Sequence, residues 1–391
     1  MLKSIAKIIV NSLINISSLF VSAQIKSVDQ KERVLIIRKD GLGDCILFYP
    51  TLKAYRDHYK DAEITLIFPK YFNSLMPLLG NNLVDKIIWF DHRSFSCDFK
   101  YRCNFMLDLK RTGYDFALYP VYSRETIGDK MIKMTGAKER IGFNGDPSVQ
   151  GLKAKIRGNN IYTKLISPPA NITLELDRDV YFANEVSGTK FEPSFPTINT
   201  DMLSSIHADQ LLNSNNLRNV KFAIIFPSSG ATYKIWQPEK WAELIRYLEG
   251  RDIVPVMCGG PKDAGFINTV IQLSIGSKNI INLVNQTDLA TLAHLLRKSC
   301  FYFGSDTGIL HLAIAVGTPT VAIVGSGGLS RFFPYGNREK NIAVYNKSWR
   351  GQLGTWENAR GLKTDGIHPS IGSISIGDAI AGIDKILSVV I

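Results

Sequence analysis

Short apolar runs that alternate with amphipathic stretches are the feature that most constrains the fold of this 391-residue chain. The pattern begins with VLIIR (34–38) and EITLIF (63–68), and it recurs in the second half as FAIIFP (222–227) and PTVAIVGS (319–326). Strands that alternate with helices form parallel sheets whose two faces are covered by helices. We therefore expect an α/β fold, and at about 150 residues per domain the chain is long enough for two or three domains.

The segment EPSFPTINTD is rich in Pro, Thr and Asn and indicates a linker between two such domains. In chain order, we expect an N-terminal extension (1–30), a first domain (31–190), a linker (191–220), a second domain (221–370) and a C-terminal helix (371–391). That last helix is a candidate to cross back to the first domain. Ligands of parallel sheets bind beyond the carboxyl ends of the strands, so we expect the site in the cleft between the domains.

Composition excludes several classes of protein. An apolar fraction of 45% with 21% charged residues excludes a disordered chain. The 5 cysteines include no C-x-x-C pair, which argues against a disulfide framework or a structural zinc site. The formal charge of +11 favours anionic partners without choosing among phosphates, acidic glycans, nucleic acid and anionic membranes.

Residues 1–26 carry Lys3, Lys7 and Lys26 but no acidic residue, and their polar side chains recur three or four positions apart. This spacing is typical of an amphipathic helix that lies in a membrane interface. Two alternatives remain open. Val21-Ser22-Ala23 resembles the cleavage site of a secretory signal, and the helix is also compatible with packing on the surface of the protein itself.

The sequence FGSDTGILHLAIAVGTPTVAIVG (303–325) is the most specific motif. A strand ends at Asp306 and a helix begins at Thr307-Gly308, where unpaired N–H groups suit a phosphate. His311 lies one turn further and is able to face the same ligand. Alternatively, Asp306 caps the helix and His311 is a surface histidine. A single D-T-G at a strand-to-helix junction excludes an aspartic protease.

The sequence VLIIRKDGLGDCILFYPTLKAYR (34–56) joins another strand to a glycine turn and a helix. Asp44 near the helix start is a candidate base for a substrate hydroxyl, and the alternative is an acidic residue that interacts with the helix dipole. The third glycine of a dinucleotide fingerprint is missing.

The third motif, FPSSGATYKIWQPEKWAELI (226–245), places hydroxyl residues and then Lys234 between a strand and a helix. Lys234 is well placed to neutralise a diphosphate, with Ser229 and Thr232 as hydrogen-bond donors. A solvated loop lysine is the alternative.

Together, in this order, the three motifs, the GG of CGGPKD and the helix DLATLAHLL resemble glycosyltransferase family 9, the ADP-heptose:lipopolysaccharide heptosyltransferases. The resemblance covers most of residues 33–336. It implies the GT-B arrangement, in which two Rossmann-like doubly wound domains face a central cleft and no metal is bound. It also implies that the first domain binds the acceptor and the second binds the sugar nucleotide.

The resemblance assigns roles to individual residues. Asp44 would be the catalytic base, and Lys234 would stabilise the departing diphosphate. The residues that would bind the nucleotide sugar are Ser229, Thr232, Lys234, Gly259, Gly260, Asp306, Thr307, Gly308 and His311. Those assigned to the acceptor are Arg38, Gly41, Gly43 and Arg124.

Charge patterning adds two expectations. Region 96–165 holds 13 Lys and Arg against 7 Asp and Glu, which favours a surface for an anionic acceptor over scattered solvated charge. Asp177-Arg178-Asp179 invites comparison with a metal-binding D-x-D motif, but it lies inside a helical pattern and is expected at the surface. We predict no metal site, no other cofactor and no nucleic-acid partner.

The leading hypothesis is an inverting glycosyltransferase that moves heptose or a related sugar from a nucleotide-diphosphate donor, with ADP-heptose expected, to an acidic lipopolysaccharide-core acceptor. We expect it in the cytoplasm of a Gram-negative bacterium, peripheral on the inner face of the cytoplasmic membrane. Two alternatives remain open: transfer to another surface glycan or a protein hydroxyl, and a non-enzymatic basic protein that binds nucleic acid or membrane.

Overall fold

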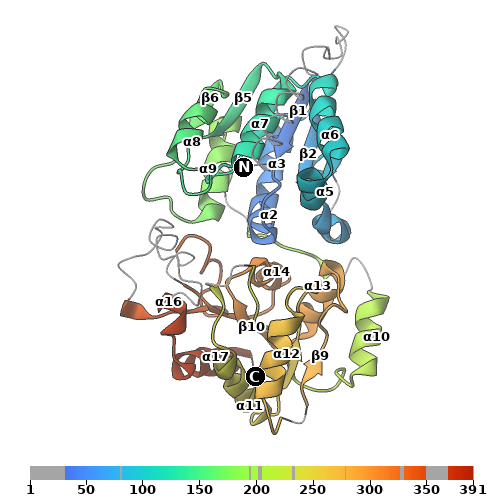
Figure 1. Ribbon diagram of the computed structural model, residues 1–391, viewed down its shortest axis with the longest axis vertical. Coiled ribbons are helices and arrows are strands. Elements are labelled where there is room, and N and C mark those ends of the chain that lie inside the picture. Colours follow the sequence, from blue (N-terminus) through green and yellow to red (C-terminus); the bar gives the residue numbers. More distant parts are fainter. Residues whose placement is uncertain are drawn as a thin grey trace.

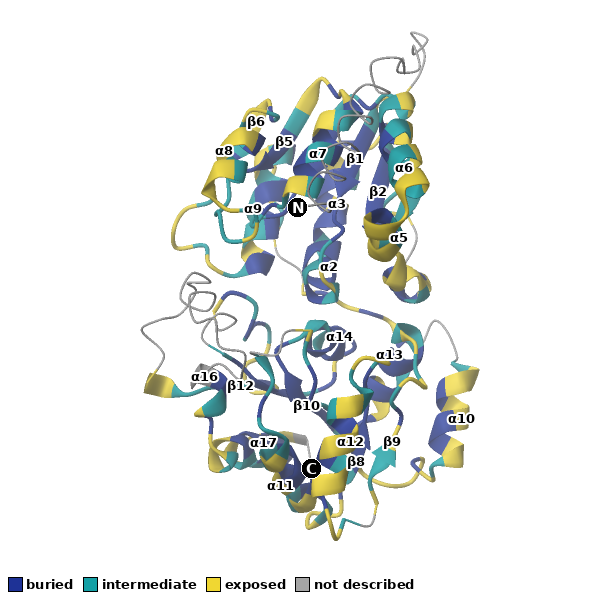
Figure 2. Cartoon of the chain, in the orientation of Figure 1, coloured by how far each residue is buried: buried dark blue, intermediate teal, exposed yellow. Residues whose placement is uncertain are grey.

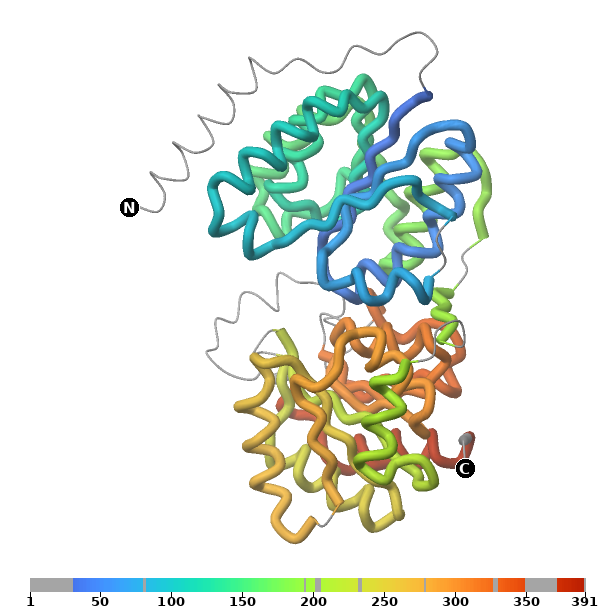
Figure 3. Tube along the Cα trace, turned by 90° about the vertical axis from the view of Figure 1, so that its right-hand side faces the viewer, coloured from blue at the N-terminus to red at the C-terminus, as the bar shows by residue number. Residues whose placement is uncertain are grey.

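The computed structural model describes residues 31–79, 82–192, 195–200, 205–230, 234–277, 279–325, 330–348 and 369–390. The helix expected for residues 1–26 and nearly all of the stretch 346–370 lie outside these residues. Two domains lie one above the other, and each contains a six-stranded parallel sheet (Figures 1 and 3). The expected fold of two doubly wound α/β domains is therefore confirmed.

The strands of the first domain are hydrogen-bonded in the order β3-β2-β1-β4-β5-β6. Their bounds are β1 Arg33–Ile37, β2 Glu63–Pro69, β3 Lys86–Phe90, β4 Phe116–Tyr119, β5 Glu139–Phe143 and β6 Lys164–Ile166. After Arg33, central strand β1 consists of consecutive apolar residues because it is buried on both faces, as parallel strands under two helical layers must be.

The strands of the second domain follow the order β12-β11-β10-β7-β8-β9. Their bounds are β7 Phe222–Phe226, β8 Val254–Met257, β9 Ile281–Asn282, β10 Phe301–Ser305, β11 Thr320–Ile323 and β12 Asn341–Val344. Counted within its own domain, this is the same strand order as in the first sheet. The order reverses between β1 and β4 and between β7 and β10, and ligands of doubly wound sheets bind at such a reversal.

Helices cover both faces of the first sheet (Figure 2). On one face lie α2 Leu42–Phe48, α3 Leu52–His58 and α9 Glu175–Ser187. On the other lie α5 His92–Cys97, α6 Phe99–Thr112 and α7 Thr126–Thr135. The remaining helical segments are η1 Tyr49–Thr51, η2 Lys70–Leu75, α4 Met76–Leu79 and α8 Leu152–Asn159.

The second sheet is covered in the same way. On one face lie α10 Ile206–Ser214, α13 Leu289–Lys298 and α14 Gly308–Ala315. On the other lie α11 Pro238–Glu249, α12 Ala264–Leu273 and α17 Ile376–Val390, which α16 Pro369–Gly372 precedes. The segment expected to be a linker therefore contains a helix of the second domain.

The C-terminal helix α17 does not cross back to the first domain. It packs against β11, β12 and α11 of the second domain. Its apolar residues Ala379, Ile383 and Ile386 are fully buried in one core with Val321 of β11. Burial of this apolar stripe on the nearest uncovered sheet face explains the position.

The two domains meet where helices α2 and α14 begin. A methyl group on Gly308 would lie 2.6 Å from Leu42 Cβ and 2.9 Å from the backbone nitrogen of Gly43. A methyl group on Gly43 would lie 2.5 Å from His311 Cδ2. Glycine is required at both positions because a side chain would push the two backbones apart. One hydrophobic core continues across this contact, from η2 and α2 to α13 and α14.

Replacement of Gly308 by alanine should destabilise the protein, because the added methyl group meets backbone atoms that cannot rotate away. We expect the free energy of unfolding to fall by about 1–3 kcal/mol, measured by urea denaturation. Gly265→Ala on helix α12 is the matched control, since a methyl group there meets no atom within 4 Å. The control should equal the wild type or gain up to about 1 kcal/mol. Equal stabilities of the two variants would contradict the close contact.

Candidate active site between the two domains

A cavity of about 510 Å³ lies beyond the carboxyl ends of β1 and β4, next to the domain contact. Its polar wall includes the carboxylates of Asp40, Asp44, Glu125 and Glu175. Its apolar wall includes Tyr71, Tyr119, Val121, Tyr122, Val149 and Phe332. Aromatic faces beside hydrogen-bond acceptors are suited to a polyhydroxylated ligand such as a sugar.

Asp44 lies in the first turn of α2 and lines this cavity. Burial raises its pKa to about 7, and the nearby carboxylates of Asp40 and Glu175 act in the same direction. The guanidinium groups of Arg38 and Arg331 oppose the rise. A carboxyl group with a pKa close to neutrality is able to accept a proton from a hydroxyl group.

Asp44 also lies close to the second domain. Its neighbour Gly43 contacts the start of α14, because a methyl group on Gly43 would lie 3.4 Å from Gly308 Cα. Gly41 lines the cavity itself, and a methyl group there would lie 2.8 Å from Asp44 Oδ2. Because Gly41 and Gly43 have no side chains, Asp44 has room to line the cavity close to the second domain.

Arg38 borders the cavity, but its guanidinium is occupied within the first domain. It is almost fully buried and donates to Asp179 Oδ1 at 2.9 Å, to Asp44 O at 3.1 Å and to Pro120 O. Its Nε lies 3.1 Å from Asp40 Oδ1. These contacts give Arg38 a role in holding the β1–α2 turn, and since Arg38 also lines the cavity, its contact with the acceptor stays a prediction.

The same contact corrects the prediction for Asp177-Arg178-Asp179. Asp177 is exposed, but Asp179 is fully buried, because it faces the sheet from α9 and binds Arg38. Burial raises the pKa of Asp179 well above its ordinary value, and Arg38 opposes that rise.

Arg124 is buried away from the cavity wall. It donates to Asn159 Oδ1, its Nη1 lies 3.4 Å from Asp129 Oδ1, and its guanidinium stacks on the ring of Tyr162. These contacts join α7, α8 and the β6 edge of the first domain. Arg124 is not among the residues that line the cavity, so its assignment to the acceptor stays a prediction.

On the side of the second domain, Lys234 and Asp306 form an ion pair with 3.4 Å between Nζ and Oδ2. Lys234 follows β7 and Asp306 follows β10, so the pair lies at the reversal of strand order. Ser228 lies at the same edge and is buried, and its hydroxyl has no hydrogen-bond partner among the described residues. Ser229 is partly buried beside it, and Thr232 lies outside the described residues.

Thr307 and Gly308 start helix α14 as predicted, and Thr307 has the extended backbone of an N-cap residue. His311 has a different environment from the one expected. It is buried between Gly43 and Tyr335, with 3.0 Å between its Nδ1 and the Tyr335 hydroxyl oxygen. Burial lowers the pKa of His311 to about 4, so the ring is neutral at pH 7. The structure places His311 in the domain contact.

Gly259 and Gly260 follow β8, at the same edge of the sheet as the end of β7. Gly259 packs closely on helix α12, where a methyl group would lie 2.7 Å from Ile267 Cδ1. The backbone nitrogen of Gly260 donates to Asp263 Oδ2 at 2.8 Å. Packing on α12 explains Gly259, and the turn closed by Asp263 explains Gly260. Contact of either glycine with the nucleotide-sugar donor stays a prediction.

Several cavity residues carry no signal in the sequence. Glu175 lies at the start of α9, Tyr122 and Glu125 follow β4, and Arg331 and Phe332 follow β11. None of them belongs to the three motifs, and they meet only because both sheets present their carboxyl ends to the same space.

Within the part of the chain that the structure describes, no group of three or more His, Cys, Asp or Glu side chains is arranged to hold a metal ion. In the same part of the chain, each helix is too short or too polar to cross a membrane.

Two facing Rossmann-like domains, with the carboxylate of Asp44 in a cavity of the first and Lys234 near a helix start of the second, form the GT-B arrangement of a glycosyltransferase. Residues 129–352, more than half of the chain, match Glycosyltransferase family 9 (heptosyltransferase). The chain belongs to this family.

This chain is also similar to individual heptosyltransferases. The lipopolysaccharide core heptosyltransferase OpsX of Haemophilus influenzae is 24% identical over 323 residues, which span 82% of this chain and 86% of OpsX. Among solved structures, ADP-heptose LPS heptosyltransferase II of Escherichia coli has a TM-score of 0.67 at 16% identity, over 91% of this chain and 98% of that one. The E. coli heptosyltransferase WaaC with ADP-2-deoxy-2-fluoro heptose has a TM-score of 0.58 at 17% identity, over 84% and 98% of the respective chains.

Replacement of Arg38 by methionine should reduce stability strongly, because the substitution leaves the buried carboxylate of Asp179 without its cation. We expect a loss of about 3–5 kcal/mol in the free energy of unfolding, measured by urea denaturation. Arg111→Met is the control, since Arg111 and Asp108 form an exposed pair on α6. It should change stability by no more than about 1 kcal/mol. A stable R38M protein that has lost only acceptor affinity would instead support a direct contact of Arg38 with the acceptor.

Proposed function

We propose that this glycosyltransferase moves heptose from ADP-heptose to a hydroxyl group of a lipopolysaccharide-core acceptor, with inversion at the transferred carbon. One observation carries the proposal: Asp44, with a pKa of about 7, lines a cavity in the first domain, while the adjacent Gly43 contacts the helix start of the second domain. A base in the acceptor cavity is thereby next to a site suited to a diphosphate.

On the donor side, Lys234 and the free N–H groups at the start of α14 would receive the nucleotide diphosphate. Lys234 is held by Asp306 close to the α14 start, and the buried hydroxyl of Ser228 is available as a donor to a phosphate oxygen. ADP-heptose as the donor is supported by the two Escherichia coli relatives, whose names refer to ADP-heptose or a fluorinated analogue.

The reaction follows from these positions. Asp44 removes the proton from the acceptor hydroxyl as the oxygen attacks the anomeric carbon of the donor. The bond from that carbon to the diphosphate breaks on the opposite face, which gives inversion. Lys234 and the α14 N–H groups stabilise the negative charge that develops on the departing diphosphate.

The lipopolysaccharide-core acceptor is supported by a known relative and by the positive charge of the first domain. OpsX is a lipopolysaccharide core heptosyltransferase, and the first domain of this chain carries a local excess of Lys and Arg. The reacting sugar would enter the cavity, and the anionic groups of the glycolipid would lie outside its carboxylate-lined wall. We place the enzyme in the cytoplasm, peripheral on the inner face of the cytoplasmic membrane, where such a glycolipid would be accessible.

Asp44→Asn should lower the rate of transfer by at least about 100-fold, because the amide cannot accept the proton. The variant should still bind ADP, measured by isothermal titration calorimetry. Asp57→Asn, an exposed substitution on α3, is the matched control and should keep wild-type activity. Retention of transfer in D44N would refute the role of the base.

The rate of wild-type transfer should rise as the pH increases through about 7. The raised pKa keeps Asp44 protonated below that pH, so the basic form is lost as the pH falls. The measurement is kcat/KM against pH with ADP-heptose and lipopolysaccharide from heptose-deficient bacteria. A profile that is flat between weakly acidic and weakly alkaline pH would contradict the proposed base.

Lys234→Gln should weaken ADP binding and lower the rate, because the positive charge beside the diphosphate is removed. We expect an effect on the order of 10-fold to 100-fold on kcat/KM. Lys221→Gln is the control, since Lys221 is exposed at the opposite edge of the same sheet, before β7.

Thermal-shift titration with a panel of nucleotide sugars tests the donor. A shift with other nucleotide sugars and none with ADP-sugars would overturn the heptose assignment.

A further inference from the structure

Arg331 belongs to the second domain but makes its polar side-chain contacts with the first. It follows β11, and its backbone is fixed to the start of α9, since Glu175 N–H donates to Arg331 O at 2.8 Å. Beside it, the Thr173 hydroxyl donates to Ser330 O at 3.3 Å. This segment of the second domain is therefore docked on the first domain by its main chain.

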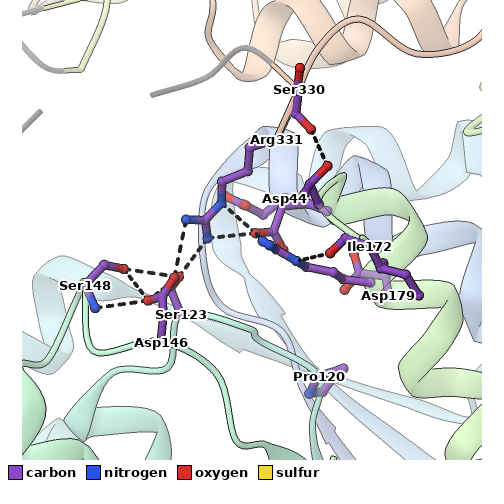
Figure 4. Close-up of polar contacts among 12 residues, drawn as sticks. Asp44, Pro120, Ser123, Asp146, Ser148, Ile172, Asp179, Ser330 and Arg331 are labelled. Atoms are coloured by element: carbon purple, nitrogen blue, oxygen red, sulfur yellow. Dashed lines mark hydrogen bonds and ion pairs between the residues drawn. The ribbon is translucent and has the colours of Figure 1, made fainter. Parts of the chain in front are cut away.

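The Arg331 side chain strengthens this docking. Its Nε and Nη2 each lie 2.7 Å from Glu175 Oε1, and Nη2 also donates to the Ser123 hydroxyl at 2.7 Å. Nη1 lies 3.6 Å from Asp146 Oδ2. Figure 4 shows the guanidinium pointing toward Ser123 and Asp146. The side chain is only 8% exposed, so these charged contacts are largely shielded from water.

The same segment forms part of the cavity that contains Asp44. Arg331 and Phe332 are the two residues of the second domain in its described wall. Because the remaining described wall belongs to the first domain, the cavity is completed only when the second domain is docked.

We propose that Arg331 is a positioning residue of the acceptor site, which through its ion pair with Glu175 fixes the second-domain wall of the cavity and presents a positive charge to the base Asp44. This inference rests on the proposed function, because it assigns the cavity to the acceptor. It goes beyond that function because it makes Arg331, which belongs to the domain proposed to bind the donor, a determinant of acceptor binding.

The charges that face Asp44 come from three parts of the chain. Arg38 and Asp40 lie in the turn before α2, Glu175 lies on α9, and Arg331 lies after β11. Asp40 and Glu175 favour the protonated form of Asp44, and the two arginines favour the carboxylate. The two members of the Arg331–Glu175 pair therefore act on the pKa of Asp44 in opposite directions.

Glu175 has a second cationic partner besides Arg331. Arg178 Nη1 on the same helix lies 2.9 Å from Glu175 Oε1. Loss of Arg331 therefore leaves a negative charge facing Asp44, and loss of the Glu175 carboxylate leaves a positive one. This difference separates an electrostatic and positioning role from a merely structural one.

The test compares Arg331→Gln with Glu175→Gln, using ADP-heptose and lipopolysaccharide from heptose-deficient bacteria. Both variants should raise the acceptor KM by about tenfold or more, since both break the interdomain pair, and both should retain ADP affinity. The pKa read from the pH profile of kcat/KM should rise in R331Q and fall in E175Q. Arg331→Lys should restore the pKa toward the wild-type value while recovering only part of the acceptor KM, because lysine lacks the planar fork.

Arg218→Gln serves as the control, since Arg218 forms an exposed pair with Asp209 inside the second domain. It should leave the acceptor KM and the pH profile unchanged. Shifts of the pKa in the same direction in R331Q and E175Q, or an unchanged acceptor KM in both, would overturn the inference. Loss of ADP affinity together with acceptor affinity would also overturn it, because that pattern indicates a general structural defect.

A second measurement keeps this inference separate from the proposed function. NMR titration of the full chain labelled with 13C at the aspartate carboxyl groups, with the Asp44 signal assigned through D44N, reports the pKa of Asp44 without any substrate. Opposite shifts in R331Q and E175Q support the electrostatic role of Arg331 even if the wild type transfers no heptose. Absence of heptose transfer by the wild type would refute only the proposed function. Identical titration curves of Asp44 in R331Q and E175Q would refute the inference.

Discussion

The close approach of two helix starts is the constraint on which the rest of the site depends. Helix α2 begins at the carboxyl edge of the first sheet and helix α14 at that of the second, and Gly43 and Gly308 let the two backbones touch. Asp44 follows Gly43, and Thr307 precedes Gly308. The contact thus brings the turn that carries Asp44 to the start of α14 in the other domain. The same contact buries His311, which accounts for its neutral ring.

Charge within the proposed acceptor cavity is balanced by ion pairs between the domains as well as inside them. The cavity brings several carboxylates together, and burial raises the pKa of Asp44 among them. Arg38 compensates for Asp40 and Asp179 from within the first domain, and Arg331 compensates for Glu175 from the second. Because Arg331 lowers the pKa of Asp44 from the second domain, the proposed function links the chemistry at Asp44 to the way the two domains are docked.

Much of the fold could be predicted from the sequence, because apolar runs of strand length and helices with one apolar stripe are local patterns. Asp44, Lys234, Asp306 and Gly308 could be singled out for a similar reason, since each follows the end of a buried strand. Roles that depend on distant partners could not be predicted. Arg38 and Arg124 were expected at an acceptor, and their ion pairs with Asp179 and Asp129 inside the first domain could not be read from the sequence. Arg331 and Glu175 carry no motif, and the ion pair between them exists only in the folded chain.

The sequence by itself determined the two doubly wound sheets, the family and the strand ends at which the proposed site lies. It did so because hydrophobic periodicity and glycine turns act over a few residues. Only the tertiary structure decided which charges are compensated, which residues complete the cavity and where the final helix packs. Those outcomes depend on side chains that are far apart in the chain and that meet after the domains dock, so their electrostatic energies are set by burial and distance rather than by sequence neighbours.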